Sequence, residues 1–385
     1  MEMKMSKSKT CKSILLAAFI LGAGCKERYI PKEIATNYSY LVVDGFLNAG
    51  NDTTTITLTR SKTLEDKNSF YPELSAQVRV EEEGSGNMFT LDEIGNGKYQ
   101  VPLLPLNPSR KYRLNIRISN GGVYQSDFVV VKNSPPIDSI SWDQNEEGVT
   151  IYANTHDPQD SSRYYRFEYT ETWEHHAEYS ALYDYKNGAV VYIADPDSNH
   201  YKCWTTQRST DILLASTARL DKDVLYKFPL RKILRNAEEI SVKYSTIVTQ
   251  YVLTEDGYQY WNLLKKNTEE LGSIFGPQPS QQTGNIHCIS NPEEPVMGYL
   301  SATTGLKKRI YINNNEVLPW QYPRNCQTIT VDAIPDSIQW YFGMLGYSPI
   351  DSVTAPPGKK YNASQKPCVY CTFTGGTTTK PSFWP

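Results

Sequence analysis

The sequence lacks the basic excess that nucleic-acid binding requires. Its 385 residues carry 39 basic and 42 acidic side chains, which gives a formal net charge of −3. A protein without a basic face cannot displace the counterions of a phosphate backbone. Apolar runs also stay short of the roughly 20 residues that a membrane-spanning helix needs. We therefore expect no nucleic-acid partner and no membrane-spanning segment.

The sequence also lacks the short motifs of common enzyme classes. It contains no H-E-x-x-H, no G-x-S-x-G, no Walker loop and no G-x-G-x-x-G. A zinc site on Cys368, Cys371, His287 and Cys288 is disfavoured, because there is one C-x-x-C only and the other two candidates are adjacent. We therefore expect no catalytic residues, no cofactor and no metal.

What the sequence has in excess is tyrosine. Its 28 Tyr accompany 23 Gly and 23 Pro, a composition typical of short strands joined by turns. From residue 38 to 133, seven short segments are separated by turns rich in Gly, Asn and Pro, and several of them alternate polar and apolar residues. Such alternation indicates strands with one buried face. This region is predicted to form a β-sandwich of the immunoglobulin or transthyretin type.

A second β-rich domain is expected over residues 137–385. Ser134-Pro135-Pro136 marks the boundary, because two successive prolines cannot continue a strand ladder. Long strands are expected near 164–174 and 240–253, and a helix near 254–271, where a threonine can cap its start. We therefore predict a mainly β fold of two sandwich-like domains, the second with a helical insertion and a docked C-terminal tail.

The first 24 residues have the organisation of an export signal. Four lysines precede an apolar run at 13–23, and small residues then lead directly into Cys25. A cleavage site that ends on cysteine resembles the lipobox of bacterial lipoproteins, in which the thiol is acylated. We therefore expect Cys25 to anchor the chain to a membrane through lipid. A tether over 25–37 follows, and its charged start resembles a surface-export signal.

Five cysteines remain after Cys25, an odd number in a compartment where disulfides can form. We expect Cys326 to pair with Cys368 or Cys371, because this bridge would tie the last 18 residues back onto the second domain. A local bridge between Cys368 and Cys371, with Cys326 free, is the alternative.

Aromatic residues are densest between positions 163 and 204. Those that alternate are expected in the core, whereas the stretch from Trp173 to Tyr185 lacks clean alternation. Exposed aromatics there could stack on sugars or anchor a protein partner. The adjacent His175 and His176 should point to opposite faces of a strand, one exposed and one half-buried. The candidate contact residues are Trp173, His175, His176, Tyr179, Tyr183 and Tyr185.

Four segments together resemble the Bacteroidetes lipoproteins of domain-of-unknown-function family 4249. They are YLVVDGFLN (Tyr40–Asn48), LTEDGYQYWNLLKKNTEELGSIF (Leu253–Phe275), GNIHCISNPEEPVMGYLSA (Gly284–Ala302) and the tail CVYCTFTGGTTTKPSFWP (Cys368–Pro385). The resemblance implies an outer-membrane, surface-exposed lipoprotein encoded beside a TonB-dependent, SusC-like receptor. It brings no catalytic residues to this chain.

Four Asp-Ser or Asp-Thr triplets resemble the O-glycosylation sequon of Bacteroidetes, with acceptors at Thr53, Ser139, Ser337 and Ser352. The function expected from the sequence is therefore a non-enzymatic accessory or ligand-binding subunit of a TonB-dependent transporter. A surface hydrolase acting on glycan or peptide, and an adhesin or structural protein of the cell surface, are the alternatives.

Overall fold

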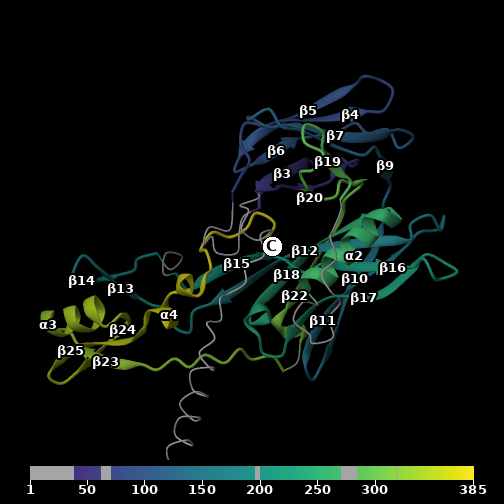
Figure 1. Cartoon of the computed structure of the whole chain (residues 1–385). Helices are drawn as coiled ribbons and strands as arrows, with labels where there is room; N and C mark the ends of the chain where they lie inside the picture. Colours follow the sequence, from purple (N-terminus) through teal and green to yellow (C-terminus); the bar gives the residue numbers. More distant parts are fainter. Residues whose placement is uncertain (1–38, 62–70, 196–199, 270–283, 318) are drawn as a thin grey trace, which may run out of the picture.

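The structure is a computed structural model that describes residues 39–61, 71–195, 200–269, 284–317 and 319–385 (Figure 1). The expected signal segment 1–24, the lipidation site Cys25 and the tether lie outside the described residues. The described chain is mainly β, so the predicted fold class is confirmed. None of its helices is long and apolar enough to cross a membrane.

The N-terminal sandwich lies at the top of Figure 1 and is formed by one sheet that folds over on itself. The turn from one layer to the other is made by β5, whose first half pairs with β4 and whose second half pairs with β6. Alternating side chains of both layers meet in one core, where Leu41, Ile56, Val78 and Leu114 are fully buried. Its first nine strands are β1 (Leu41–Gly45), β2 (Leu47–Asn48), β3 (Thr54–Arg60), β4 (Gln77–Glu82), β5 (Met88–Gly95), β6 (Lys98–Val101), β7 (Lys111–Arg117), β8 (Val123–Ser126) and β9 (Val129–Lys132).

Three later strands also belong to this sandwich, which differs from the predicted assignment of everything after residue 137 to the second domain. They are β19 (Ile286–Cys288), β20 (Val296–Met297) and β21 (Ala302–Thr303). β19 pairs with β8, β20 with β1, and β21 fits between β2 and β9. The chain returns here because these strands satisfy open sheet edges and bury apolar side chains in the first core.

The second sandwich has two separate sheets packed around one core. One sheet has the order β10-β11-β17, and the other has the order β15-β12-β18-β22 with β16 also on β12. Val149, Phe167, Tyr244, Val248 and Ile312 come from both sheets and fill the core between them. The strands are β10 (Ile137–Asn145), β11 (Gly148–His156), β17 (Val224–Leu234), β12 (Tyr164–His176), β15 (Lys202–Arg208), β16 (Leu213–Ser216), β18 (Lys243–Val252) and β22 (Leu306–Asn313).

The helical insertion is α2 (Glu255–Glu269), which follows β18 directly. The hydroxyl of Thr254 accepts a hydrogen bond from the backbone N–H of Gly257 at 3.2 Å, and so it caps the start of the helix. The guanidinium of Arg166 on β12 lies 3.6 Å from the ring centre of Trp261. This cation–π contact fastens the helix to the second sandwich.

A third, smaller body extends to the left in Figure 1, and we call it the distal lobe (residues 183–192 and 329–365). The sequence predicted a single larger domain after residue 137, so this lobe is a difference from the expectation. It has its own small core around Val331, Phe342 and Ala363. Its elements are the hairpin β13 (Tyr183–Lys186) and β14 (Ala189–Tyr192), the sheet β23 (Ile329–Asp332), β25 (Gly358–Gln365) and β24 (Tyr347–Ala355), and the helices α3 (Pro335–Ile338) and η4 (Gln339–Met344).

Candidate functional site

Two disulfides hold the chain together where the distal lobe meets the second sandwich. One joins Cys326 to Cys368, which is one of the two pairings expected from the sequence. The other joins Cys203 on β15 to Cys371, a pairing that the sequence did not suggest. Cys288 is free and buried. The two cysteines of the C-x-x-C thus pair with different partners and fix both ends of α4 (Lys366–Val369), which rules out a local bridge between them.

After the C-x-x-C, the chain runs along the second sandwich as a segment that we call the C-terminal strap (residues 376–384). Thr377 exchanges two backbone hydrogen bonds with Trp204 on β15, at 2.8 and 3.0 Å. Trp384 is buried and its indole N–H donates to the carboxylate of Glu174 at 3.1 Å. The guanidinium of Arg309 lies 3.7 Å from the ring centre of Phe383. The last residues are therefore docked.

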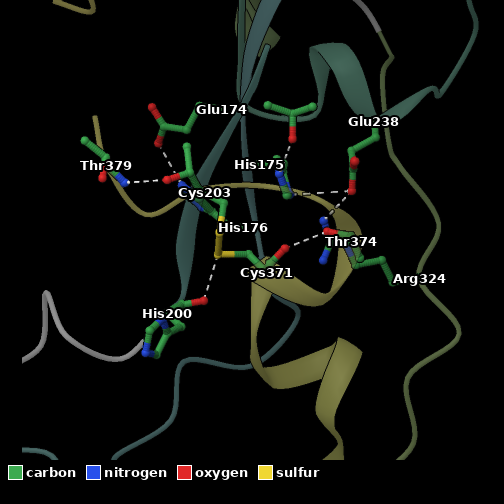
Figure 2. The surroundings of a disulfide bond; sticks show 12 residues. Glu174, His175, His176, His200, Cys203, Glu238, Arg324, Cys371, Thr374 and Thr379 are labelled. Carbon is green, nitrogen blue, oxygen red and sulfur yellow. Dashed lines mark hydrogen bonds and ion pairs between the residues drawn. A yellow bond between two sulfur atoms is a disulfide. The ribbon is translucent and has the colours of Figure 1, made fainter. Parts of the chain in front are cut away.

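His175 lies beneath this strap and is fully buried (Figure 2). Its Nε2 is 3.0 Å from the hydroxyl of Thr205, and its Nδ1 is 3.8 Å from a carboxylate oxygen of Glu238. Burial is the main cause that lowers the pKa of His175 to about 4, and the positive charge of Arg324 adds to this effect. The imidazole is therefore neutral at pH 7 and closed to solvent.

The expected contact surface around the two histidines is wrong in part. Trp173 and His175 are buried, so they cannot touch a ligand or partner. His176 does point to the opposite face, where it is half-buried: its Nε2 lies 2.8 Å from Glu174 and its ring packs against Tyr201 at 4.7 Å. The strap, remote in sequence, covers the face that the lack of alternation had suggested to be open.

The other three candidates lie at the junction with the distal lobe and are half-buried. Tyr179 donates its hydroxyl to the carbonyl oxygen of Cys326 at 3.2 Å. The hydroxyl of Tyr183 is 3.2 Å from that of Ser352, and Tyr185 donates to Gln339 at 2.6 Å. These tyrosines fasten the β13–β14 hairpin to the rest of the lobe.

The lobe carries an exposed group of large apolar side chains that was not predicted from the sequence. Trp340 is 53% exposed and Met344, one turn later on η4, is 65% exposed. Leu345 follows at once, and its N–H bonds back to the carbonyl of Trp340 at 3.0 Å. We call these three residues the apolar face. The signal in the sequence was the run Trp340–Leu345, of which only Phe342 is buried in the lobe core.

The four candidate glycosylation acceptors differ in access. Thr53, just before β3, and Ser139 on β10 are exposed, whereas Ser337 on α3 and Ser352 on β24 are half-buried. The hydroxyl of Ser352 already contacts Tyr183. The positions open enough for a bulky sugar are therefore Thr53 and Ser139. Among the described residues no group of three or more His, Cys, Asp or Glu side chains is placed to hold a metal.

One protein family matches this chain over most of its length. The model of the family "Domain of unknown function (DUF4249)" matches residues 26–309, from just after Cys25 to the last strand of the second sandwich. A search of curated proteins gave no match. Among solved structures, the FN1–FN3 domains of chicken CNTN1 are similar at 13% identity with a TM-score of 0.19, over 58% of this chain and 65% of that one. On the strength of the family match, this protein belongs to the domain-of-unknown-function family DUF4249.

Proposed function

We propose that this protein is a lipid-anchored lipoprotein of the outer membrane of a Bacteroidetes cell, displayed at the surface. In this proposal it works as a non-enzymatic accessory subunit of a TonB-dependent, SusC-like receptor. The lipobox-like approach to Cys25 supports the anchor. Several acyl chains on one cysteine would hold the chain firmly at the membrane, since each buried methylene adds about 0.8 kcal/mol.

The observation that carries the proposal is the apolar face of the distal lobe. Large apolar side chains that cluster in the open mark surfaces for partners, and Trp is prominent among the residues that dominate binding energy. Two disulfides and the three tyrosines of the hairpin hold the lobe in place. A surface held in place before binding loses less entropy when a partner docks.

The geometry gives little support to a hydrolase built on the two histidines. Such an enzyme would need His175 and His176 beside an acid in one open pocket. The structure puts their rings on opposite faces of β12, with His175 closed off by the strap. Glu171, a buried acid on the same strand, is already paired with Arg231 at 3.2 Å and with the hydroxyl of Tyr244 at 3.0 Å.

Purification from native membranes tests the proposal. The outer membrane is solubilised in mild detergent, and the tagged protein is isolated together with whatever remains bound. We expect a large TonB-dependent barrel protein to co-elute in near-equal amount. The Cys25→Ala variant should lose acyl labelling and leave the membrane fraction. Elution of the wild-type protein alone would contradict the receptor partnership, and acyl labelling that persists in Cys25→Ala would contradict the anchor.

A further inference from the structure

A small hollow lies where the β13–β14 hairpin meets the segment that carries the C-x-x-C. Its volume is about 240 Å³, which suits one residue-sized group better than a drug-sized ligand or a polymer. Three separate parts of the chain build it: strand β13, the loop end at His200, and α4 with the turn after it. The side chains that matter are Asp184, Tyr185, His200, Lys366, Tyr370 and Phe373.

One wall of the hollow is a polar chain that is already complete. The hydroxyl of Ser348 bonds to the hydroxyl of Tyr370, which donates to Asp184 at 2.6 Å. Asp184 also pairs with Lys186 at 2.9 Å. Burial acts to raise the pKa of Asp184, but the hydrogen bonds from Tyr370 and Lys186 outweigh it and hold that pKa below its usual value. This wall is fixed in place, and its negative charge is matched by Lys186.

Two nitrogen-bearing side chains at the hollow have donors to offer a ligand. In the part of the chain that the structure describes, neither the ammonium of Lys366 nor the imidazole nitrogens of His200 take part in a hydrogen bond or an ion pair. The ring of His200 stands edge-on to Tyr370, with 5.9 Å between the ring centres. Because Lys186 already balances Asp184, Lys366 leaves the hollow with a net positive charge. This charge favours an anion.

An exposed ring completes the site. Phe373 is 59% exposed, although its ring is 6.1 Å from that of Tyr370 in a stacked arrangement. A phenyl ring next to a positive charge offers an apolar surface to the body of a ligand whose charge lies at Lys366. We infer that the hollow binds a carboxylate attached to a compact apolar or ring-shaped body, with the carboxylate at Lys366 and His200 and the body against Phe373.

This inference goes beyond the proposed partnership and does not depend on it. A carboxylate on such a body could come from the end of a peptide or from an acidic sugar. Calorimetric titration of the full processed protein in detergent micelles separates the two sources, with N-acetylphenylalanine and glucuronic acid as probes. N-acetylphenylalanine amide and glucose are their uncharged counterparts. We expect one acid to bind saturably, and its neutral counterpart to bind about tenfold more weakly or worse, since a charge-assisted hydrogen bond is lost.

Variants locate the binding. Lys366→Met should weaken the acid that binds by about tenfold. Lys380→Met, which removes an exposed lysine of the strap outside the hollow, should change nothing. Phe373→Ala alters a mostly exposed side chain, so it should fold normally and still weaken binding. The inference is overturned if neither acid binds, if the neutral counterpart binds equally well, or if both Lys366→Met and Phe373→Ala retain wild-type affinity.

Discussion

Gly376 lies directly against the imidazole of His175, although about 200 residues of chain separate them. A methyl group at Gly376 would come within 2.5 Å of the Nε2 of His175 and within 2.6 Å of the Cβ of Cys203. Neither neighbour can move away easily, because His175 is bonded to Thr205 and Cys203 is tied to Cys371. The strap closes over β12 at this point because the residue has no side chain.

The first prediction follows from this contact. Gly376→Ala should lower the free energy of unfolding by about 2 kcal/mol, since the added methyl group overpacks a site that cannot relax. Gly358→Ala is the matched control, because a methyl group there would meet open space. Denaturant unfolding measures both variants. Equal stability of the two would contradict the docked strap.

The disulfide arrangement gives the second prediction. The denatured but unreduced chain from residue 26 onward should react with an alkylating reagent at Cys288 alone. Replacing Cys326 and Cys368 by serine should lower the free energy of unfolding by about 4 kcal/mol, because that bridge closes a long loop. Peptide mapping without reduction checks the pairs. A fragment with Cys368 bonded to Cys371 would refute the arrangement.

The third prediction concerns pH. The unfolded chain protonates His175 near its ordinary pKa of 6.5, whereas the folded protein resists protonation until about pH 4. The contribution of this histidine to stability is therefore fully present above pH 6.5 and is lost as the pH falls toward 4. The loss should reach about 2–3 kcal/mol, because a histidine whose pKa is lowered tenfold in acidity constant loses about 1.4 kcal/mol of binding free energy for its proton.

Unfolding free energies of the wild type and of His175→Gln, measured between pH 7 and pH 4, isolate this effect. Their difference should shrink as the pH falls, since Glu238, Glu174, His176 and Arg324 titrate similarly in both proteins. His156→Gln is the control of opposite sign, because hydrogen bonding to Asp138 raises the pKa of that exposed histidine. Parallel pH curves for the wild type and His175→Gln would contradict a sealed, neutral imidazole.

Local features of the fold could be predicted from the sequence. The alternation that begins at Tyr164 indicated a long strand, and β12 begins there and ends at His176. The threonine expected to cap the helix does so through its hydroxyl. These features depend on neighbours within a few residues, where side-chain period and capping chemistry are visible in one sequence.

Long-range pairings could not be predicted in the same way. The strands β20 and β21 are two residues long and show no period, so their return to the first sandwich leaves no local signal. The burial of Trp173 and His175 depends on a strap that follows about 200 residues later. The same holds for the bridge between Cys203 and Cys371, which joins residues 168 positions apart.

The central claim is that the apolar face of the distal lobe docks onto a TonB-dependent receptor. The most direct measurement is the amount of receptor that co-purifies with the double variant Trp340→Ser/Met344→Ser. The control is Ile94→Ser/Leu103→Ser, which removes two similarly exposed apolar side chains from the N-terminal sandwich. We expect the lobe variant to retain less than about a tenth of the receptor, since buried anchors of this kind each contribute about 2 kcal/mol or more. The control should retain the full amount. Equal recovery of receptor with both variants would contradict the claim.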